Sequence, residues 1–359
     1  MIVVLLLFVS VIGALDLSCK DLRGRKTDWF VAYKLPDGIS GLQDSGKSFV
    51  YFDGKSPGWI LSGKKIDDPT SAIGRTLSQL WEVKKDSELL YAVYNDDHPD
   101  KGGRTLSDSY RAHMKGALAF DDFTGFLMSH SVPNFVDLNK RKYSFPDTGT
   151  KFGQTFICLT LSVTQLKEIG EYLYFAQPSI VRTKVPTSFK KLFPALTNAL
   201  GQRRFSSKRG ALSSFQWLET LGGMRIATFS KNRKLKKDIY KDIIAENLRL
   251  PLAVESWSLG SSSNLRSSCG SNTILNIREI SFQANGRPIV FQNSKDHSKW
   301  AVSGSASQPI VCIGDINRQT SQLERGGGAL CISNKQLWTQ FRTSISTLEC
   351  CGGREASRC

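Results

Sequence analysis

Residues 113–132 have the sequence HMKGALAFDDFTGFLMSHSV, and this stretch predicts the central motif of the fold. Two apolar runs, Lys115–Asp121 and Gly125–Val132, flank the short segment 122–124, which predicts two antiparallel strands joined by a hairpin. The hairpin is preceded by a histidine, and its first strand opens with a lysine two positions later. Residues i and i+2 of a strand project from one face, so we expect these two side chains to point together.

The same tripeptide pattern occurs again half a chain later. His113-Met114-Lys115 is matched by His297-Ser298-Lys299, and the two copies hold half of the 4 histidines in the chain. An imidazole beside an ammonium group suits phosphate chemistry, because one group can attack or donate a proton while the other binds a non-bridging oxygen. One His-x-Lys arises readily by chance, whereas two copies in matching contexts are more informative.

Similar residues follow each copy. Asn134 comes shortly after the first hairpin, and Asn317 follows the second copy within Gly314-Asp315-Ile316-Asn317. A weaker echo relates residues 153–158 to residues 326–331, since each segment begins with glycine and ends with cysteine. This spacing predicts a diverged internal duplication.

The other apolar runs predict strands that alternate with helices, which is typical of a layered α/β architecture. The predicted strands are Trp29–Leu35, Ser48–Phe52, Leu89–Tyr94, Thr155–Ser162, Leu252–Ser258, Ile274–Phe282, Pro288–Gln292 and Ile310–Ile313. The predicted helices are Gly74–Trp81, Val163–Tyr174, Asn232–Leu248 and Ser333–Leu348. The basic stretch Ala176–Gly210 has no clean period, and we expect it to be a linker or lid.

The N-terminus predicts a signal peptide over residues 1–15. Ile2–Leu15 is almost entirely apolar but too short to span a bilayer, and Ala14 suits a cleavage site. No later run approaches the length of a transmembrane helix. The 8 widely spaced cysteines then predict disulfides of the secretory pathway. The chain has no Cys-x-x-Cys and few histidines, so no zinc site is expected.

The composition predicts a globular protein with a polyanionic partner. Hydrophobic residues make up 40%, which excludes wholesale disorder, and 48 Lys+Arg against 32 Asp+Glu give a net charge of +16. A basic cluster opens the predicted helix Asn232–Leu248, where cations oppose the helix macrodipole. Its members are either a footprint for DNA phosphates or a solvated face: Lys231, Arg233, Lys234, Lys236 and Lys237.

These features together resemble the deoxyribonuclease II family, the acid endonuclease branch of the phospholipase D superfamily. The resemblance covers nearly the whole chain after the signal peptide. The segments that carry it are 19–21, 28–36, 73–77, 94–96, 113–116, 130–135, 153–155, 296–300, 314–318 and 325–328. The superfamily's His-x-Lys-x4-Asp is not matched strictly, because Asp121 lies one residue late, which puts a role for Asp121 in doubt.

The resemblance implies an α/β fold of two pseudo-twofold-related phospholipase D-like halves, each a mixed β-sheet flanked by helices. The halves are residues 16–178 and 179–359, and the two His-x-Lys motifs meet at their seam. The implied reaction is cleavage of double-stranded DNA at acid pH, without metal or cofactor, leaving 3′-phosphate and 5′-hydroxyl ends. A secreted protein is expected, with the lysosome as the alternative.

The resemblance also implies disulfides and site residues. The disulfides are Cys19–Cys158, Cys312–Cys331 and Cys269–Cys350, which leaves Cys351 to pair with Cys359, although Cys350 and Cys351 can exchange roles. His113 is the expected nucleophile and His297 the general acid, in an order that stays open, while Lys115 and Lys299 hold the phosphate oxygens. The expected supporting residues are Asn134, Asp315, Asn317, Glu324 and His130. Asp315 and Glu324 are expected to orient an imidazole, and His130 to support the site structurally.

Two alternatives come from other functional classes. The first is a catalytically inactive secreted relative that binds DNA or another polyanion, against which both complete motifs argue. The second is a phospholipid hydrolase, which predicts an apolar lipid-facing surface instead of basic clusters. The oligomeric state and any sequence preference are not set by these motifs.

Overall fold

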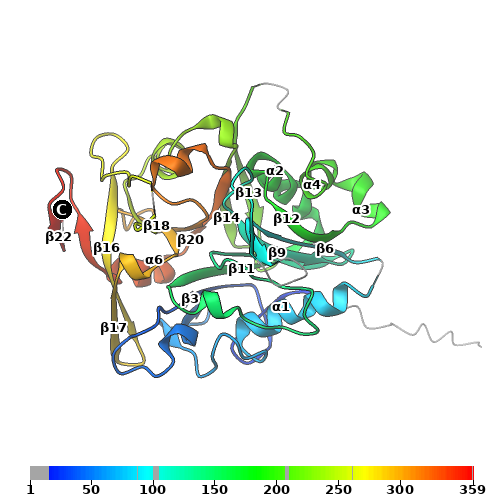
Figure 1. Cartoon of the computed structure of the whole chain (residues 1–359), viewed down its shortest axis with the longest axis horizontal. Coiled ribbons are helices and arrows are strands. Elements are labelled where there is room, and N and C mark those ends of the chain that lie inside the picture. The colour runs from blue at the N-terminus through cyan, green and yellow to red at the C-terminus, as the bar shows by residue number, and fades with distance from the viewer. Residues whose placement is uncertain (1–15, 87, 100–104, 207–209, 261, 358) are drawn as a thin grey trace, which may run out of the picture.

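A computed structural model describes residues 16–86, 88–99, 105–206, 210–260, 262–357 and 359 of the chain. The expected signal peptide, residues 1–15, lies outside the described residues. The described chain forms two large β-sheets with helices around and between them (Figure 1). Within these ranges no helix is both long enough and apolar enough to cross a membrane.

The first sheet is built from the N-terminal half, and its described strand pairs are all antiparallel. Its strands, in spatial order, are β12 (Ile180–Lys184), β6 (Leu90–Asn95), β9 (Lys115–Phe120), β10 (Thr124–His130), β11 (Gln154–Ser162), β3 (Trp29–Lys34), β4 (Phe49–Asp53) and β5 (Ile60–Leu61). Two short ribbons lie outside it: β1 (Cys19–Lys20) with β2 (Lys26–Thr27), and β7 (Asp97–Pro99) with β8 (Thr105–Ser107).

The second sheet is built from the C-terminal half and is mixed, because β15 and β16 are parallel. Its strands, in spatial order, are β13 (Ser213–Glu219), β14 (Arg225–Lys231), β20 (Gly327–Ser333), β19 (Ile310–Gly314), β18 (Lys299–Ser303), β15 (Leu252–Ser256), β16 (Ile274–Ala284), β21 (Ile345–Glu349) and β22 (Glu355–Ala356), with β17 (Arg287–Gln292) also pairing with β16.

The helices are short. The α-helices are α1 (Ala72–Val83), α2 (Leu166–Ala176), α3 (Thr187–Leu192), α4 (Pro194–Leu200), α5 (Glu246–Leu248) and α6 (Lys335–Thr343), and a π-helix, Tyr240–Ala245, runs into α5. The 3-10 turns are Ser45–Lys47, Asp147–Gly149, Val163–Gln165, Arg233–Leu235, Asn293–Lys295 and Thr320–Glu324. α1 begins after Ser71, whose hydroxyl accepts the Gly74 N–H at 3.0 Å, as expected for an N-cap.

Five strands of each sheet follow the same path. The order β6-β9-β10-β11-β3 in the first sheet corresponds to β15-β18-β19-β20-β14 in the second, and every neighbouring pair in both runs is antiparallel. In each half the strand that ends this run, β3 or β14, comes first in the chain, and the strand after the His-x-Lys motif lies second. The expected duplication into two α/β halves is therefore confirmed by the topology.

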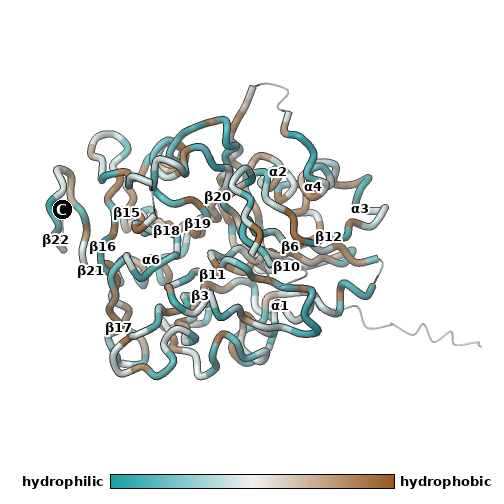
Figure 2. The backbone as a smooth tube through the Cα atoms, viewed as in Figure 1, coloured by the Kyte–Doolittle hydropathy of each residue, from teal (hydrophilic) through white to brown (hydrophobic). Residues whose placement is uncertain are grey.

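Both faces of each sheet are covered by apolar side chains. On β3, Val31 and Tyr33 face a central core that also contains α2, α6 and inward residues of the second sheet, whereas Phe30 and Ala32 face α1. A third core lies between the second sheet and the π-helix. Figure 1 shows α1 below the first sheet with α2 and α4 above it, and in Figure 2 the brown apolar stretches follow the strands. The layers therefore alternate between helices and sheets, with the central core joining the two halves.

The prediction of one helix over Asn232–Leu248 is wrong in its first part. Asn232 caps a 3-10 turn by accepting the Lys234 N–H, and Lys236 has φ 55°, which ends that turn. The regular helix begins only after Asp238, whose carboxylate accepts the N–H of Tyr240 at 2.9 Å. An acidic residue now sits where the macrodipole favours it, and the cations lie before the helix.

Ala176–Gly210 is only partly a linker. Ile180–Lys184 adds β12 to the edge of the first sheet, and α3 and α4 follow it. The change from one sheet to the other therefore falls after β12, beyond the expected boundary between residues 178 and 179. Further along, Ser333–Leu348 divides into α6 and β21, so its prediction as one helix is also wrong at its end.

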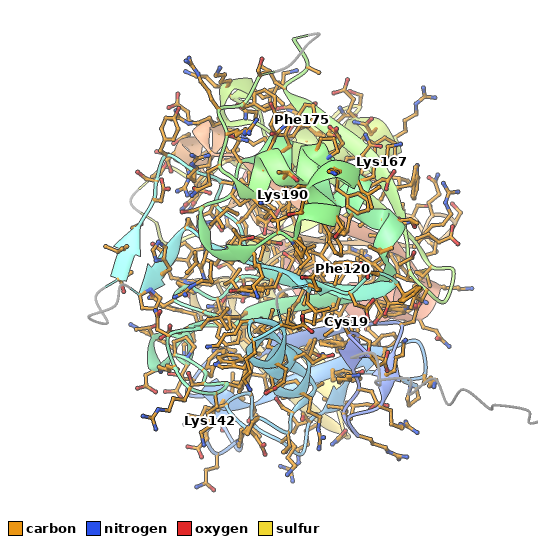
Figure 3. All side chains as sticks on the ribbon, turned by 90° about the vertical axis from the view of Figure 1, so that its right-hand side faces the viewer. Cys19, Phe120, Lys142, Lys167, Phe175 and Lys190 are labelled. Atoms are coloured by element: carbon orange, nitrogen blue, oxygen red, sulfur yellow. A yellow bond between two sulfur atoms is a disulfide. The ribbon has the colours of Figure 1, made fainter. Side chains whose placement is uncertain are left out.

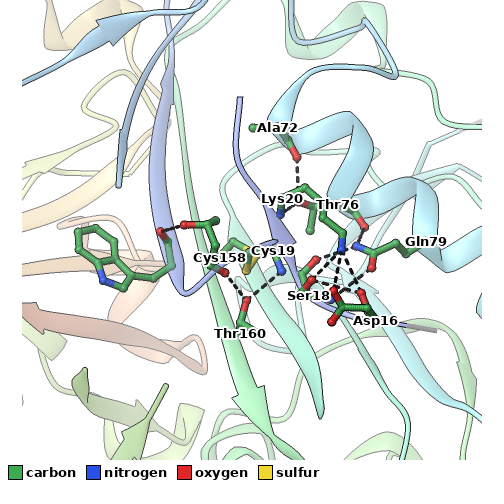
Figure 4. The surroundings of a disulfide bond; sticks show 11 residues. Asp16, Ser18, Cys19, Lys20, Ala72, Thr76, Gln79, Cys158 and Thr160 are labelled. Atoms are coloured by element: carbon green, nitrogen blue, oxygen red, sulfur yellow. Dashed lines mark hydrogen bonds and ion pairs between the residues drawn. A yellow bond between two sulfur atoms is a disulfide. The ribbon is translucent and has the colours of Figure 1, made fainter. Parts of the chain in front are cut away.

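All eight cysteines are in disulfides. Cys19–Cys158 joins the N-terminal ribbon to β11, where Thr160 accepts the Cys19 N–H at 3.0 Å (Figure 4), and Cys312–Cys331 joins β19 to β20. The other two follow the alternative in which Cys350 and Cys351 exchange roles, because Cys269 bonds Cys351 and Cys350 bonds Cys359.

The two halves are joined by a reciprocal pair of backbone hydrogen bonds. The His113 N–H donates to the Gly326 carbonyl, and the His297 N–H donates to the Gly153 carbonyl, each at 2.9 Å. A Cβ on Gly326 would overlap the Ala176 carbonyl oxygen, and one on Gly153 would overlap the Asp296 carboxylate. Both positions therefore require glycine, and both glycines belong to the sequence echo between residues 153–158 and 326–331.

Replacing Gly326 by alanine should loosen this seam. Overpacking of a closed site costs about 1–3 kcal/mol, so Gly326→Ala should lower the free energy of unfolding by that amount, as measured by urea denaturation. Gly63→Ala is the matched control, because a Cβ there meets nothing within 4 Å. Equal unfolding midpoints for the two variants would show that the seam tolerates the extra methyl group.

Candidate active site

Both His-x-Lys motifs lie at the seam, each at the entry to an equivalent strand. Lys115 is the first residue of β9 and Lys299 the first of β18, and the histidines lie two residues before them. The charge of Lys115 acts on the pKa of His297 and of Lys299, and the charge of Lys299 acts on the pKa of His113. The fold therefore brings the two sequence motifs into one cationic centre.

His113 is held in one tautomer. Its Nδ1 lies 2.6 Å from the backbone carbonyl of Asp315. A carbonyl can only accept, so Nδ1 carries the proton and Nε2 keeps its lone pair. The side chain is 16% exposed, and burial, followed by the charge of Lys115, holds the pKa of His113 well below its usual range. His113 is thus a neutral imidazole with a free lone pair on Nε2.

His297 is held by aromatic rings. Phe152 stacks on it with centroids 4.1 Å apart, and Trp257 meets it edge-on at 4.0 Å. Its Nε2 is buried without a hydrogen-bond partner among the described residues. Burial and the charges of Lys299 and Lys115 lower the pKa of His297 to about 3. The two histidines are therefore related by topology but differ in what holds them.

Asp96 is the functional residue that sequence reasoning missed. It lies just beyond β6, buried, where it pairs with Lys115 and accepts from Arg325 Nη2 at 2.8 Å, and its carboxylate lies 3.9 Å from His113 Nε2. Burial raises the pKa of Asp96, but the charges of Lys115 and then Arg325 outweigh it and hold the pKa well below its usual range. The signal for it in the sequence was its position, because Asp96 is an acidic residue shortly after the apolar run Leu89–Tyr94.

Lys299 has no such carboxylate partner among the described residues. Its Nζ donates to the His297 carbonyl at 2.6 Å, and burial, followed by the charge of Lys115, lowers its pKa to about 7. The motif of the second half is instead held in place by Asp296, whose carboxylate accepts hydrogen bonds from the Tyr33 and Ser298 hydroxyls. The pKa of Asp296 is raised by burial. The centre consequently carries more positive charge than its carboxylates compensate.

Asp315 supports the site, but not as expected. Its backbone carbonyl, and not its carboxylate, orients His113. The carboxylate accepts the Gly328 N–H at 3.1 Å and the Tyr172 hydroxyl at 3.3 Å, and burial raises the pKa of Asp315 to about 7. Asp315 thus links the β19–β20 end of the second sheet to the histidine of the first half.

The expected orienting role of Glu324 is wrong. Its side chain is exposed and pairs with Lys236 at 3.0 Å, and it contacts neither histidine within the described chain. Asp96 occupies the position beside an imidazole that Glu324 was expected to take. Asp121 is a turn residue, since its carboxylate accepts the N–H groups of Phe123 and Thr124 at 2.7 Å each in the hairpin loop.

The remaining expected supporting residues are His130, Asn134 and Asn317. His130 is buried between Phe135 and Phe156, its Nδ1 accepts the Val132 N–H at 3.2 Å, and burial, followed by the charge of Lys115, lowers its pKa to about 3. Asn134 lies in a turn with φ 58°, a left-handed backbone conformation that only small polar residues and glycine adopt readily. Asn317 is buried.

The basic cluster divides into buried and exposed members. Lys231 is fully buried and donates to the Leu323 carbonyl at 2.7 Å, so its prediction as a surface contact is wrong. Lys234, Lys236 and Lys237 are exposed and Arg233 is partly exposed. The exposed lysines precede the π-helix instead of lying on a helix face. Sequence alone placed the cluster at the start of one helix, and only the fold separates its members.

Groups of three or more metal-ligating side chains are absent from the described residues. The charges of Lys115 and Lys299 act on both histidines, and ammonium groups repel cations. A donor set for a resident metal ion is therefore not found at this seam in the described chain.

Comparison with known proteins identifies the family. The family model for deoxyribonuclease II matches residues 18–351. The chain is 39% identical to cell-death-related nuclease 7 of Caenorhabditis elegans, with 93% of this chain and 88% of that protein covered. It is 34% identical to deoxyribonuclease-2 of the same organism, where the match covers 93% of this chain and 94% of that protein. It is also 34% identical to deoxyribonuclease-2-alpha of Rattus norvegicus, where the match covers 93% of this chain and 95% of that protein.

These matches extend over both halves and over both His-x-Lys motifs, in agreement with the resemblance seen in the motifs and with the duplicated topology. The chain belongs to the deoxyribonuclease II family.

Proposed function

We propose that this protein is an endodeoxyribonuclease that hydrolyses double-stranded DNA at acid pH without a metal ion, leaving 3′-phosphate and 5′-hydroxyl ends. The observation that carries the proposal is the single seam in which both His-x-Lys motifs meet. The family relatives support DNA as the substrate. The disulfides and the apolar N-terminal sequence support a secreted or lysosomal protein.

The first step forms a phosphohistidine. The Nε2 lone pair of His113 attacks the phosphorus atom, the P–N bond forms, and the P–O5′ bond breaks as protonated His297 gives its proton to the departing oxygen. The tautomer set by the Asp315 carbonyl supports His113 as the nucleophile, because it leaves the lone pair on the nitrogen that faces Lys115 and Asp96.

The second step reverses these roles. Neutral His297 takes a proton from water, the water oxygen attacks phosphorus, and the P–N bond to His113 breaks, which releases the 3′-phosphate. Lys115 and Lys299 hold the non-bridging oxygens, where charge gathers in the transition state. The negative charge of the phosphate balances the excess positive charge of the seam.

DNA is held through its phosphates by the exposed members of the basic cluster, Lys234, Lys236 and Lys237, together with the partly exposed Arg233, as the net charge of +16 supports. A catalytically inactive polyanion binder would share this surface. It would not need two intact motifs, a fixed His113 tautomer and a paired Lys115. End-group analysis of plasmid DNA cut at pH 5 distinguishes the two, since only the enzyme yields 3′-phosphate ends.

Removing either histidine should abolish cleavage. We expect His113→Ala and His297→Ala each to lower kcat by a factor on the order of 1,000 or more, with the double variant little worse, because the two act as one unit. Release of acid-soluble nucleotides measures the rate, and urea unfolding checks the fold. His98→Ala is the control, because His98 contacts neither motif in the described chain. A half-active His297→Ala protein would show that the halves do not share one site.

Chelators should leave cleavage intact. The seam supplies Lys115 and Lys299 where a metal ion would otherwise neutralise the phosphate, so excess EDTA should not change the rate of plasmid nicking at pH 5. Abolition by EDTA with rescue by Mg²⁺ would contradict the proposed mechanism and point to a metal-dependent nuclease.

The rate should have a bell-shaped, acidic pH profile. In the free protein the pKa of His297 is lowered to about 3, so His297 is neutral at pH 5. A bound phosphate anion favours the protonated form and raises this pKa, so the alkaline limb of kcat should lie at higher pH than that of kcat/KM. We expect the optimum at roughly pH 4.5–6, from the ordinary histidine pKa of about 6.5. An optimum above about pH 7.5 would exclude His297 as the general acid.

A further inference from the structure

A cavity of about 330 Å³ opens beside the candidate active site. Its volume is at the lower end of the range of about 300–1,000 Å³ typical of small-ligand pockets. It lies where the segment before His113, the segment after α4 and the 3-10 turn of the basic cluster come together. The residues that give it chemical character are Tyr110, Arg111, Arg204, Phe205, Arg233 and Lys234.

The cavity shares its walls with the catalytic centre. Gly326 lines the cavity, and its carbonyl accepts the His113 N–H at 2.9 Å. Arg111 precedes His113 by two residues, and its carbonyl accepts from Arg325 Nε at 2.8 Å while Arg325 also binds Asp96. The cavity is therefore adjacent to the backbone that holds His113.

The cavity is cationic and its charges are not paired. Arg111, Arg204, Arg233 and Lys234 form no ion pair with any described carboxylate. Arg111 is oriented by bonds of 3.3 Å to the Gln177 side chain and the Gln202 carbonyl. The Nε of Arg233 is buried and has no hydrogen-bond partner within the described part of the chain. An unsatisfied buried donor on a cation is costly, and an anionic oxygen would relieve that cost.

The cavity also offers ring faces. The Arg233 guanidinium lies 4.2 Å from the centroid of Tyr110, whose side chain is 64% exposed. Phe205 is packed against Phe175, with centroids 5.3 Å apart. Nucleic-acid bases stack on aromatic rings and on guanidinium planes, and guanidinium groups bind phosphate oxygens in pairs. This combination of ring faces and paired donors matches a nucleotide better than a bare phosphate.

The geometry points to a nucleotide subsite: the cavity binds one nucleotide of the cleaved strand, next to the scissile phosphate, with its base unstacked from the duplex. The base must leave the helix because a base within a duplex has no free face to offer Tyr110. The inference rests on the proposed function, and it adds that strand opening next to the cut accompanies binding.

The test compares two substrates in steady-state kinetics. A single-stranded oligonucleotide fills the subsite, whereas bis(p-nitrophenyl) phosphate supplies one diester without a nucleotide or a neighbouring phosphate. We expect Tyr110→Ala and Arg233→Ala each to raise KM for the oligonucleotide about tenfold, with little change in kcat and no change for the small diester. Lys142→Ala is the matched control, because this exposed lysine lies at the opposite end of the molecule from Phe175, which packs on the cavity (Figure 3).

Arg233→Lys separates stacking from charge. An ammonium group keeps the charge but loses the planar fork, so this variant should recover only part of the oligonucleotide KM. Full recovery would show that the cavity offers charge alone and would overturn the nucleotide subsite.

The other outcomes are also decisive. An unchanged KM in both alanine variants would overturn the subsite and leave the nuclease proposal standing. Equal losses on both substrates would place the effect on His113 or on folding, and would overturn the subsite as well. A wild-type protein that cuts the plasmid but neither of these substrates would overturn the subsite alone, whereas one that does not cut the plasmid either would overturn the proposed function.

Discussion

The structure depends on the reciprocal contact in which each motif histidine donates its backbone N–H to a glycine of the other half. His113 is bonded to Gly326 and His297 to Gly153, so each half needs a glycine of the other half to hold its motif histidine. The absence of a Cβ at both glycines allows the two sheets to approach until their strand entries meet. A duplicated fold thereby produces one centre instead of two.

The symmetry of the backbone does not extend to the charges. In the first half the Asp96 carboxylate pairs with Lys115 and also with Arg325 of the second half. In the second half no carboxylate of the described residues pairs with Lys299, and burial together with Lys115 lowers the pKa of both Lys299 and His297. Burying like charges costs free energy, and a phosphate that enters the seam offsets this cost. The electrostatic imbalance is thus a built-in preference for an anionic substrate.

The surroundings of the seam suit a polymeric substrate. The cavity next to His113 carries arginines that pair with no described carboxylate and the exposed ring of Tyr110, and the aromatic pair Phe152 and Trp257 holds His297 on the other motif. In the proposed reaction, rigid supports for both histidines lower the reorganisation that is needed. Asp96 and the Asp315 carbonyl would then act through Lys115 and His113, which they contact.

The sequence by itself determined the features that local pattern encodes: the hairpin at Lys115–Asp121 and Gly125–Val132, the repeated His-x-Lys, the duplication and the family. These depend on residue spacing along the chain, which period-two and tripeptide patterns express directly. Only the tertiary structure decided that Asp96 takes the position expected of Glu324, that Lys231 is buried, and that Cys351 and not Cys350 bonds Cys269. Each of these depends on strand register and on contacts between residues distant in the chain, and such contacts leave no periodic trace in a single sequence.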